Sequence, residues 1–435
     1  MKINLPSFVK EILKNFLKSG HEIYIAGGAV RDLVMGKEVT DWDFTTDAPP
    51  EIILGLFPDG FYDNIFGTVG LINPTEKGLK DRYGKQIIYE VTTFRREIGY
   101  SDKRHPDKVI WGKTVEEDLI RRDFTINAMA LKPTGNWKLE TGNFQLIDPH
   151  GGQKDIKAKL IRAVGNPDER FSEDALRMMR AVRIATQLGF SIEEKTFEAI
   201  KKNVDLIDKI SAERIRDELL KLLSYQYAAD GYMLLRNSGL AEKVLPDVEK
   251  GFGVEQKSPG RHHIFDVGVH SVMSLRCSHS SDPIVNLAIL LHDVGKPIVA
   301  RVKKGSVITF YNHEILGASI ARNIAQNLKL SKKEEKKLVT LVRWHQFSVD
   351  ERQTDKAIRR FVRNVGKANL NDMLILRVAD RLGGGAQETS WRLERFKQKL
   401  IEVQKQPFLV TDLKIDGNDI MKTLKIHPDL WWAGF

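Results

Sequence analysis

The sequence contains a single cysteine, Cys277, and no apolar run long enough to cross a lipid bilayer. One cysteine excludes an internal disulfide framework and favours a reducing compartment, so we expect a cytoplasmic protein without membrane contact. The N-terminal stretch lacks the apolar core of a signal peptide and has the spacing of an amphipathic helix. Repeats and low-complexity tracts are also missing, and 435 residues predict two to four globular domains.

Acidic residues are in the minority, since the sequence contains 58 Asp and Glu but 68 Lys and Arg, which gives a net charge of +10. The segment from Lys329 to Lys367 holds 12 basic residues against 5 acidic ones. Helical spacing predicts that one face of this segment carries Lys356, Arg360, Arg363 and Lys367. Two interpretations stay open: the solvated face of an amphipathic helix, or a surface that binds the phosphates of RNA.

The hydrophobic pattern changes along the chain. Strand and helix patterns alternate in the first third, whereas residues 167–245 have an almost purely helical pattern. The Gly-rich, charged stretch 251–261 is the best domain boundary, and a second helical region with one hairpin over residues 301–312 follows it. We therefore predict an α+β fold with a mixed sheet and helices in residues 1–150, a helical neck in 151–250, a helical body in 251–405 and a short tail in 406–435.

Two aspartates stand close together in the stretch TDWDF. Asp41 and Asp43 are two residues apart in a predicted strand, so their side chains point the same way with Cα atoms about 6.6 Å apart. Such a pair is costly without a cation, and two Mg²⁺ ions held there would suit phosphoryl transfer. A solvent-facing turn is the alternative. Glu90 is our candidate for a third carboxylate, although an ion pair with Arg95 or Arg96 explains it equally well.

The preceding stretch, GGAVRD, opens a predicted short helix. Gly27 and Gly28 have no β-carbon, so backbone N–H groups there can approach a triphosphate at the start of the helix. Arg31 would neutralise further phosphate charge. A Gly-Gly step with a purely structural role is the alternative.

These motifs continue, in order, with EEDLIRRDFTINAMAL (116–131), SEDALRMMRAVR (172–183) and SAERIRDEL (211–219). As a set they resemble the signature of the class II nucleotidyltransferases, the superfamily of tRNA CCA-adding enzymes and bacterial poly(A) polymerases. The resemblance implies a polymerase-beta-like nucleotidyltransferase head, in which Arg122, Asp123 and Asn127 contact the sugar and the triphosphate. It also makes residues 172–183 a neck that reads the nucleotide base.

The neck motif has a physical basis of its own. The predicted helix places Asp174, Arg177 and Arg180 on one face at intervals of three residues. A carboxylate accepts from an exocyclic amino group, and a guanidinium donates to a ring nitrogen or carbonyl. Cytosine and adenine both carry an amino group beside an acceptor, so one such pair could read both and reject uracil and guanine. The alternative is an ordinary ion pair between residues i and i+3.

Two further segments bear on the resemblance. Residues 96–111 are polar and charged, with a break at Pro106, and resemble the family's flexible loop, here with Asp102 and Arg104. The presence of this loop implies addition of the terminal adenosine. After the stretch KIHP the resemblance leads us to expect a further helical segment, so either the tail is truncated or its RNA contacts differ.

Seven of the eleven histidines lie between residues 262 and 345. Our candidates for the mixed N/O ligands of a divalent metal are His270, His292, Asp293 and Asp380. Imidazole nitrogens favour a transition metal over Mg²⁺. The order of these residues resembles the complete motif set of the HD phosphohydrolase superfamily, and His313 and His345 match positions that extend such sites towards a second metal.

Together these features predict template-independent addition of CCA to the 3′ end of tRNA, with CTP and ATP as substrates and pyrophosphate as product. The HD motifs predict a second, metal-dependent phosphohydrolase activity. The alternatives are a poly(A) polymerase and an HD phosphohydrolase whose head only recruits RNA. A pure RNA-binding module would predict decay of one acidic set, and neither has decayed. The oligomeric state is not predicted.

Overall fold

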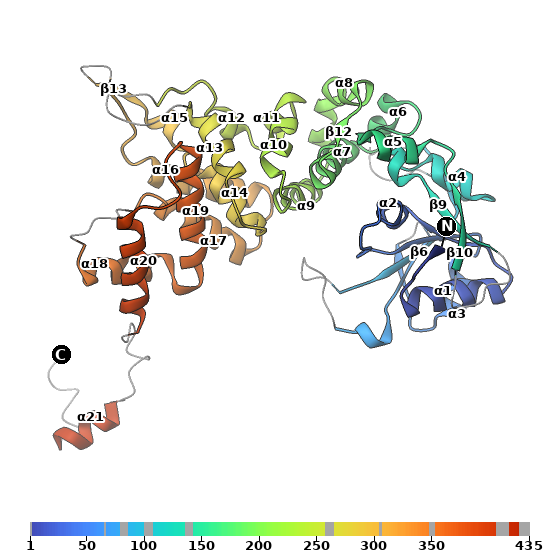
Figure 1. The fold of residues 1–435 in the computed structure, drawn as a ribbon, viewed down its shortest axis with the longest axis horizontal. Helices are drawn as coiled ribbons and strands as arrows, with labels where there is room; N and C mark the ends of the chain where they lie inside the picture. The colour runs from blue at the N-terminus through green and yellow to red at the C-terminus, as the bar shows by residue number, and fades with distance from the viewer. Residues whose placement is uncertain are drawn as a thin grey trace. The chain divides into compact units, whose positions relative to one another are not determined.

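The computed structural model describes residues 2–64, 67–78, 86–99, 108–134, 142–256, 265–303, 307–347, 353–405 and 417–425. The chain divides into two compact units (Figure 1). The first contains Met1–Glu249 with Ser281–Pro283 and Gln326–Leu330, and the second contains Lys250–Ser280, Ile284–Ala325 and Ser331–Phe435. The main division falls beside the stretch 251–261, while the boundaries at residues 150 and 405 stay predictions.

A mixed sheet dominates the beginning of the first unit. Within the described residues it has eight strands, in the order β1 (Lys2–Ile3), β10 (Gly142–Ile147), β9 (Ala130–Thr134), β2 (Ile23–Ala26), β3 (Asp43–Thr46), β6 (Tyr89–Thr93), β5 (Thr68–Leu71) and β4 (Phe61–Asn64). Neighbouring strands run antiparallel, except that β3 and β6 run parallel. The parallel pair is the one that carries the candidate carboxylates.

Side-chain alternation separates a core face from a polar face on β3. Phe44 and its register partner Val91 belong to the same apolar core as Val9 and Ile12 of α1 (Ser7–Lys18). Burial of each such side chain contributes about 1.5–3 kcal/mol to folding. Because successive side chains in a strand point to opposite faces, Asp43 lies on the face away from this core.

The rest of the first unit is mostly helical. The remaining helices are α2 (Gly28–Val34), α3 (Pro50–Leu56), α4 (Val115–Ile120), α5 (Gly152–Ala158), α6 (Pro167–Glu173), α7 (Leu176–Leu188), α8 (Glu194–Asn203), α9 (Ala212–Leu223), α10 (Ala228–Asn237), α11 (Leu240–Val244) and α12 (Pro246–Glu249). Short 3₁₀ turns are η1 (Pro74–Glu76), η2 (Thr125–Asn127) and η3 (Val204–Lys209). Two small strand pairs join β7 (Arg95–Ile98) to β8 (Lys108–Trp111) and β11 (Leu160–Ile161) to β12 (Ser191–Ile192).

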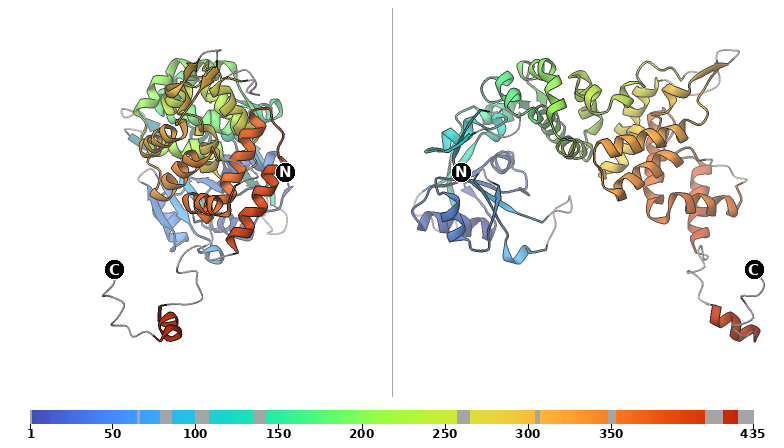
Figure 2. Two further views of the ribbon diagram at one scale, coloured as in Figure 1. Left: turned by 90° about the vertical axis from the view of Figure 1, so that its left-hand side faces the viewer. Right: turned by 180° about the vertical axis from the view of Figure 1, so that it is seen from behind.

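The second unit is built mainly from helices (Figure 2). They are α13 (Val267–Arg276), α14 (Pro283–Leu291), α15 (Lys296–Val299), α16 (His313–Asn327), α17 (Lys332–Trp344), α18 (Asp355–Val365), α19 (Leu370–Gly383), α20 (Trp391–Gln404) and α21 (Gly417–Leu424), with the 3₁₀ turn η4 (Lys367–Asn369). The strands β13 (Arg301–Lys303) and β14 (Val307–Thr309) pair antiparallel, as the predicted hairpin requires. The predicted α+β fold class is therefore confirmed. In the described parts of the chain, no helix combines the length and hydrophobicity needed to span a membrane.

Candidate functional sites

Two of the three candidate carboxylates, Asp43 and Glu90, lie on β3 and β6. The strand begins at Asp43 rather than at Asp41, so the predicted strand is too long by two residues and Asp41 lies in the bend before it. Asp41 and Asp43 flank Trp42, which is buried in the core. In the parallel register Asp43 is the partner of Glu90, so the two residues occupy the same face of the sheet.

The electrostatics of Asp43 indicate a site for a cation. Burial and the nearby charge of Asp41 raise the pKa of Asp43 to about 6, although Arg122, Arg180 and Arg31 oppose the shift. Crowded carboxylates of this kind suit Mg²⁺, which prefers oxygen ligands. The residues present therefore fit the magnesium site that the sequence predicts.

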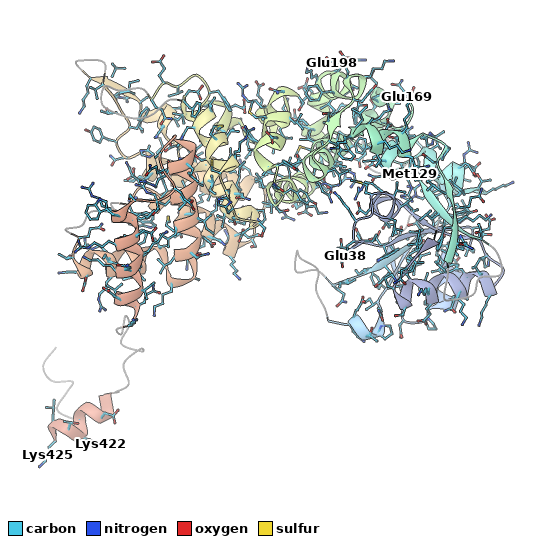
Figure 3. The ribbon with its side chains drawn as sticks, in the orientation of Figure 1. Glu38, Met129, Glu169, Glu198, Lys422 and Lys425 are labelled. Atoms are coloured by element: carbon cyan, nitrogen blue, oxygen red, sulfur yellow. The ribbon has the colours of Figure 1, made fainter. Side chains whose placement is uncertain are left out.

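Gly27 is required where the helix α2 meets these carboxylates. It precedes α2 with a φ of 70°, a conformation that side chains rarely adopt. A β-carbon on Gly27 would lie 2.7 Å from Nη1 of Arg122 and 3.0 Å from Oδ2 of Asp43. The backbone N–H of Gly27 donates to the carbonyl of Met129 at 3.3 Å. Met129 is labelled in Figure 3. The glycine thus lets the backbone pass directly beside a carboxylate and a guanidinium, whereas a β-carbon on Gly28 would meet only ordinary contacts.

Arg31 lies buried beneath this turn. Its Nε and Nη2 donate to Asp32 at 2.8 and 2.9 Å, and its Nη1 donates to Oδ1 of Asn127 at 3.0 Å. The guanidinium also approaches within 4 Å of the position that a β-carbon on Gly28 would take. Arg31 and Asn127, which are 96 residues apart in the sequence, therefore meet at the start of α2.

Arg122 retains at least one donor, its Nε, that no described residue engages. Its Nη2 donates to Oδ2 of Asp118 at 3.1 Å, while its Nε is buried and has no hydrogen-bond partner among the described residues. Asp118 is completely buried and also accepts from Arg121. A helical spacing of four residues could have identified Asp118 as the residue that positions Arg122, but the sequence analysis missed it.

Asp123 joins the head to the neck. Its Oδ2 pairs with Nη2 of Arg180 at 2.6 Å, and its Oδ1 accepts from the amide nitrogen of Asn127 at 3.2 Å. Burial opposes ionisation of Asp123, yet the charge of Arg180 outweighs it and holds the pKa at about 2. Asp123 is therefore ionised and acts within the protein to hold Arg180 and Asn127.

The structure corrects the predicted geometry of the neck. Asp174 is not helical: it lies between α6 and α7 with φ −136° and ψ 104°, so it does not share a helical face with Arg177. Asp174 pairs with Arg214 at 2.8 Å, and Arg177 donates to Glu173 and to the carbonyl of Arg121 at 3.1 Å. Arg214 was missed because it stands 40 residues from Asp174, where no local spacing links the two.

The six predicted HD residues converge in the second unit. On one side, Nε2 of His270 lies 3.2 Å from Nε2 of His292 and 3.1 Å from Oδ1 of Asp380. On the other, Nε2 of His313 lies 3.3 Å from Nε2 of His345. Asp293 stands between the two sides, with Oδ2 at 3.2 Å from His292 and Oδ1 at 3.4 Å from His313. We call this set of six residues the HD cluster.

The histidines of the HD cluster are oriented by the backbone. Nδ1 of His292, His313 and His345 lies 2.7, 2.7 and 2.8 Å from the carbonyls of Ile289, Phe310 and Val342. A proton on Nδ1 that donates to a carbonyl leaves the lone pair on Nε2, which points into the cluster. Burial lowers the pKa of His345 and so favours its neutral form. Burial also opposes the cation of His292, but the charges of Asp293 and Asp380 outweigh it and raise the pKa of His292. In spite of burial, His292 and Lys296 hold the pKa of Asp293 well below its usual range. A metal binds ionised carboxylates and displaces the proton of an imidazole, so the residues fit one.

The basic helix differs in part from its prediction. Ile358, Val362 and Val365 of α18 are buried, and Lys356, Arg360 and Arg363 are exposed. The helix ends at Val365 because Gly366 follows with a φ of 81°, so Lys367 lies in η4 and not on the predicted helical face. Asp102 and Arg104 of the predicted flexible loop lie outside the described residues, as does most of the predicted tail.

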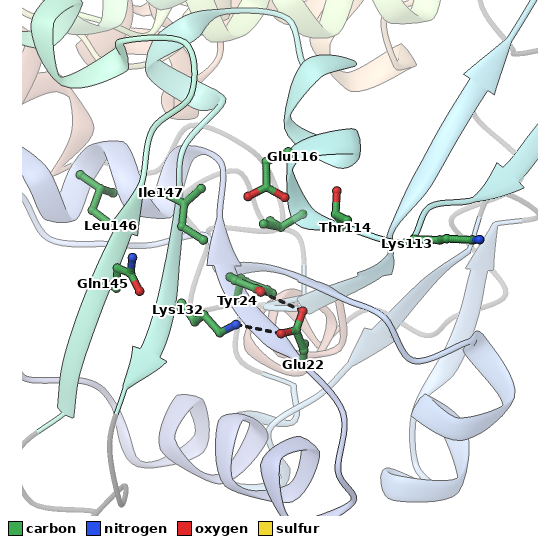
Figure 4. A pocket seen from close by; sticks show the side chains of 10 residues that line it. Glu22, Tyr24, Lys113, Thr114, Glu116, Lys132, Gln145, Leu146 and Ile147 are labelled. Atoms are coloured by element: carbon green, nitrogen blue, oxygen red, sulfur yellow. Dashed lines mark hydrogen bonds and ion pairs between the residues drawn. The ribbon is translucent and has the colours of Figure 1, made fainter.

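A separate cavity of about 490 Å³ opens in the head (Figure 4). There Glu22 accepts hydrogen bonds from Lys132 at 2.8 Å and from Tyr24 at 2.9 Å. The opposite charges of Glu22 and Lys132 compensate each other. None of the predicted site residues lines this cavity.

Comparison with known proteins gives family matches in three successive segments. Residues 23–162 match the model of the "Poly A polymerase head domain", residues 189–252 match the "Probable RNA and SrmB- binding site of polymerase A", and residues 270–384 match the "HD domain". The predicted carboxylates, the neck and the HD cluster therefore fall in or beside the matching segments.

Relatives and solved structures are similar over different lengths. The chain is 44% identical over 237 residues to a CCA-adding enzyme from Lactobacillus helveticus, and 42% identical over 241 residues to one from Geobacillus thermodenitrificans. These alignments cover 54% and 55% of the chain and of each relative, so the chain spans about half the length of the curated relatives it matches. The crystal structure of the Bacillus stearothermophilus CCA-adding enzyme in complex with CTP is similar with a TM-score of 0.66 and 26% identity, over 97% of this chain and 89% of that one. The Thermotoga maritima CCA-adding enzyme complexed with tRNA shares the fold, with a TM-score of 0.58 and 18% identity, over 96% of this chain and 87% of that one.

Proposed function

We propose that this chain is a class II nucleotidyltransferase that adds CCA to the 3′ end of tRNA from CTP and ATP, because separate segments match the poly A polymerase head domain and the HD domain, and the relatives that it resembles are CCA-adding enzymes. One observation carries the proposal: a backbone turn at Gly27 passes close to both the carboxylate of Asp43 and the guanidinium of Arg122. Phosphoryl transfer needs such a meeting of a carboxylate for a cation and donors for phosphate oxygens.

Each residue of the head has a task in this reaction. Asp41, Asp43 and Glu90 would hold Mg²⁺, which stabilises negative charge on the phosphates when bound. Arg122 keeps a buried Nε for a phosphate oxygen, and Arg31 adds positive charge beneath the turn. The 3′-hydroxyl oxygen of the RNA forms a bond to the α-phosphorus, and its proton passes to water. The bond between the α-phosphorus and the oxygen that bridges to the β-phosphate breaks, and pyrophosphate leaves with that oxygen.

Selection of the base is assigned to the neck. Asp174 is held by Arg214, which fixes the direction of the carboxylate. A fixed carboxylate accepts from the amino group of cytosine or adenine and repels the carbonyl oxygens of uracil. Arg177 is held by Glu173 and two backbone carbonyls, so the direction of its guanidinium is fixed.

A direct assay tests the proposal. The protein is incubated with tRNA that lacks its 3′ CCA, with each NTP singly and with CTP and ATP together, and the product ends are sequenced. We expect two cytidines with CTP alone and a complete CCA with both nucleotides. Long adenosine tails on unrelated RNAs would instead identify a poly(A) polymerase, and no incorporation at all would contradict nucleotide transfer.

We also propose a metal-dependent phosphohydrolase activity at the HD cluster. The convergence of three Nε2 atoms with locked Nδ1 partners around Asp293 supports metal binding, and a transition metal suits these nitrogen ligands. A bound metal would lower the pKa of a water molecule and so supply a nucleophile. The test is metal-dependent release of phosphate from p-nitrophenyl phosphate, which the head has no means to hydrolyse.

A further inference from the structure

A second cavity lies in the second unit, where α19 meets the start of α20. Its volume is about 340 Å³ and its lining consists of Arg377, Arg381, Ser390, Trp391, Arg392 and Leu393. Half of these residues are arginines, and Trp391 is 59% exposed. We call this cavity the Arg–Trp pocket.

The arginines of the pocket carry more positive charge than the surrounding protein neutralises. Arg377 donates from Nη1 to Asp380 at 3.2 Å, and its Nε is buried without a hydrogen-bond partner in the described parts of the chain. Arg381 donates to the carbonyls of Gln387 and Thr389, which bear no charge. Among the described residues no carboxylate pairs with Arg381 or Arg392, so the pocket favours an anion.

The pocket also offers an aromatic surface. Trp391 opens α20, a helix of 14 residues, and the guanidinium of Arg392 lies 5.2 Å from the centroid of its ring. The side chain of Ser390 accepts from the N–H of Leu393, which fixes this first turn. An exposed indole stacks on nucleobases of any kind, and arginines beside it bind phosphate, so the lining fits a nucleotide better than a simple anion.

The pocket is connected to the HD cluster through Arg377, which lines the pocket and donates to Asp380 of the cluster. Asp380 stands between Arg377 and Arg381 in the sequence of α19, and its Oδ1 lies 3.1 Å from Nε2 of His270. We infer that the Arg–Trp pocket binds a nucleotide beside the HD cluster, with phosphate on the arginines and the base against Trp391. The inference rests on the proposed phosphohydrolase function for the role of this nucleotide as the substrate, but binding itself needs no metal.

Equilibrium binding to the full chain tests the pocket without reference to activity. Guanosine 5′-monophosphate and inorganic phosphate are titrated calorimetrically in EDTA into the wild type and into Arg381→Ala, Arg392→Ala, Trp391→Ala and Trp391→Phe. We expect roughly a tenfold loss of affinity for both probes in each arginine variant, as for a lost charge-assisted hydrogen bond. Trp391→Ala weakens the nucleotide about tenfold and leaves inorganic phosphate unchanged, while Trp391→Phe retains most of the affinity.

Arg395→Ala is the matched control, because Arg395 is exposed on the same helix and does not line the pocket. Equal affinities in all variants would overturn the inference, because the nucleotide would then bind elsewhere, for example at the head. An equal loss of affinity in the Arg395→Ala control would also overturn it, because binding would then depend on the overall positive charge and not on the pocket. A trinucleotide with a 3′-phosphate distinguishes an RNA end from a free nucleotide as the natural ligand of the pocket. Tighter binding than that of the mononucleotide, with the same loss of affinity in each pocket variant, indicates an RNA end. Weaker binding indicates a free nucleotide. If the pocket variants lose binding but the wild type does not hydrolyse p-nitrophenyl phosphate, the phosphohydrolase proposal fails and the pocket stands.

Discussion

The head site and the HD cluster hold their charged groups in opposite ways. In the head, Asp41 and Glu90 are exposed, and the site depends on a backbone turn at Gly27 and on cations that are themselves held by acids. In the HD cluster, five of the six residues are buried, and backbone carbonyls orient three of the histidines. An open site of carboxylates suits an ion that arrives with its substrate, whereas a closed site of imidazoles suits a resident metal.

The largest effect that this comparison predicts comes from removal of the central carboxylate of the head. Asp43→Asn keeps the shape of the side chain but loses the charge that would hold Mg²⁺, so we expect incorporation of labelled CTP to fall by about a thousandfold or more. Hydrolysis of p-nitrophenyl phosphate should not change, because the HD cluster has its own ligands. Asp59→Asn, an exposed change in the same unit, is the control and should keep full incorporation. Near-normal incorporation by Asp43→Asn would remove Asp43 from the metal site.

The reverse experiment removes two residues of the HD cluster. In the double variant His292→Ala with Asp293→Ala, we expect loss of the bound transition metal and of phosphate release, while addition of CTP and ATP continues. Loss of Asp293 also leaves the buried Lys296 without its ion pair, so some loss of stability accompanies the change. Metal analysis of the purified proteins checks the result, with the exposed His279→Ala as control. A double variant with the metal content of the wild type, or a wild type without any such metal, would show that the cluster is only structural.

Sequence reasoning succeeded where function depends on short spacings. The strand with Asp43 and the strand with Glu90 follow from local patterns, because the strand period decides which side chains share a face. The HD residues follow instead from the resemblance of their order to that of the HD superfamily. Sequence reasoning failed where the chain departs from its regular period. The helix breaks at Asp174 and ends before Gly366, and both departures move a charged residue off its predicted face. The ion pair of Asp174 with Arg214 spans 40 residues and depends on helix packing, which a local pattern does not contain.

Base selection provides a smaller effect. Asp174→Ala should relax discrimination against UTP by about 1–3 kcal/mol, or roughly 5- to 150-fold, because the acceptor for the amino group is lost. Arg214→Gln should relax it less, since the carboxylate remains but loses the partner that fixes its direction. Asp168→Ala changes an acid of α6 that pairs with Lys202, and it is the control. Ratios of kcat/KM for CTP, ATP and UTP provide the measurement, and unchanged ratios with a lower rate would make Asp174 structural.

The raised pKa of Asp43 predicts a dependence of stability on pH in the absence of metal. A carboxyl whose pKa is about 6 when folded and 3.8 in the reference state favours folding when protonated, so its contribution is complete below pH 3.8 and is lost as the pH rises through 6. At pH 7 Asp43→Asn should therefore raise the free energy of unfolding by about 3 kcal/mol, and the gain should vanish near pH 4. Urea denaturation in EDTA measures it, with Asp59→Asn as control. Addition of Mg²⁺ to the wild type should reduce the difference at pH 7, and a gain that does not vary with pH would contradict the assignment.

The smallest expected effect concerns the basic helix, which belongs to neither site. Arg360 and Arg363 are exposed on α18, so they are either solvated or in contact with the phosphates of tRNA. If they contact phosphates, Arg360→Glu with Arg363→Glu lowers the slope of log affinity against log salt by about one unit for each lost contact. Reversal of the exposed Lys18 and Lys77 in the head changes the net charge equally and tests whether position matters. Filter binding of tRNA between 50 and 200 mM salt is a suitable measurement, because a phosphate contact has its clearest effect over this range. Equal slopes for the two double variants would show that the helix attracts tRNA only through the overall charge of the protein. A reduced slope for the α18 variant alone would place the helix at the RNA interface.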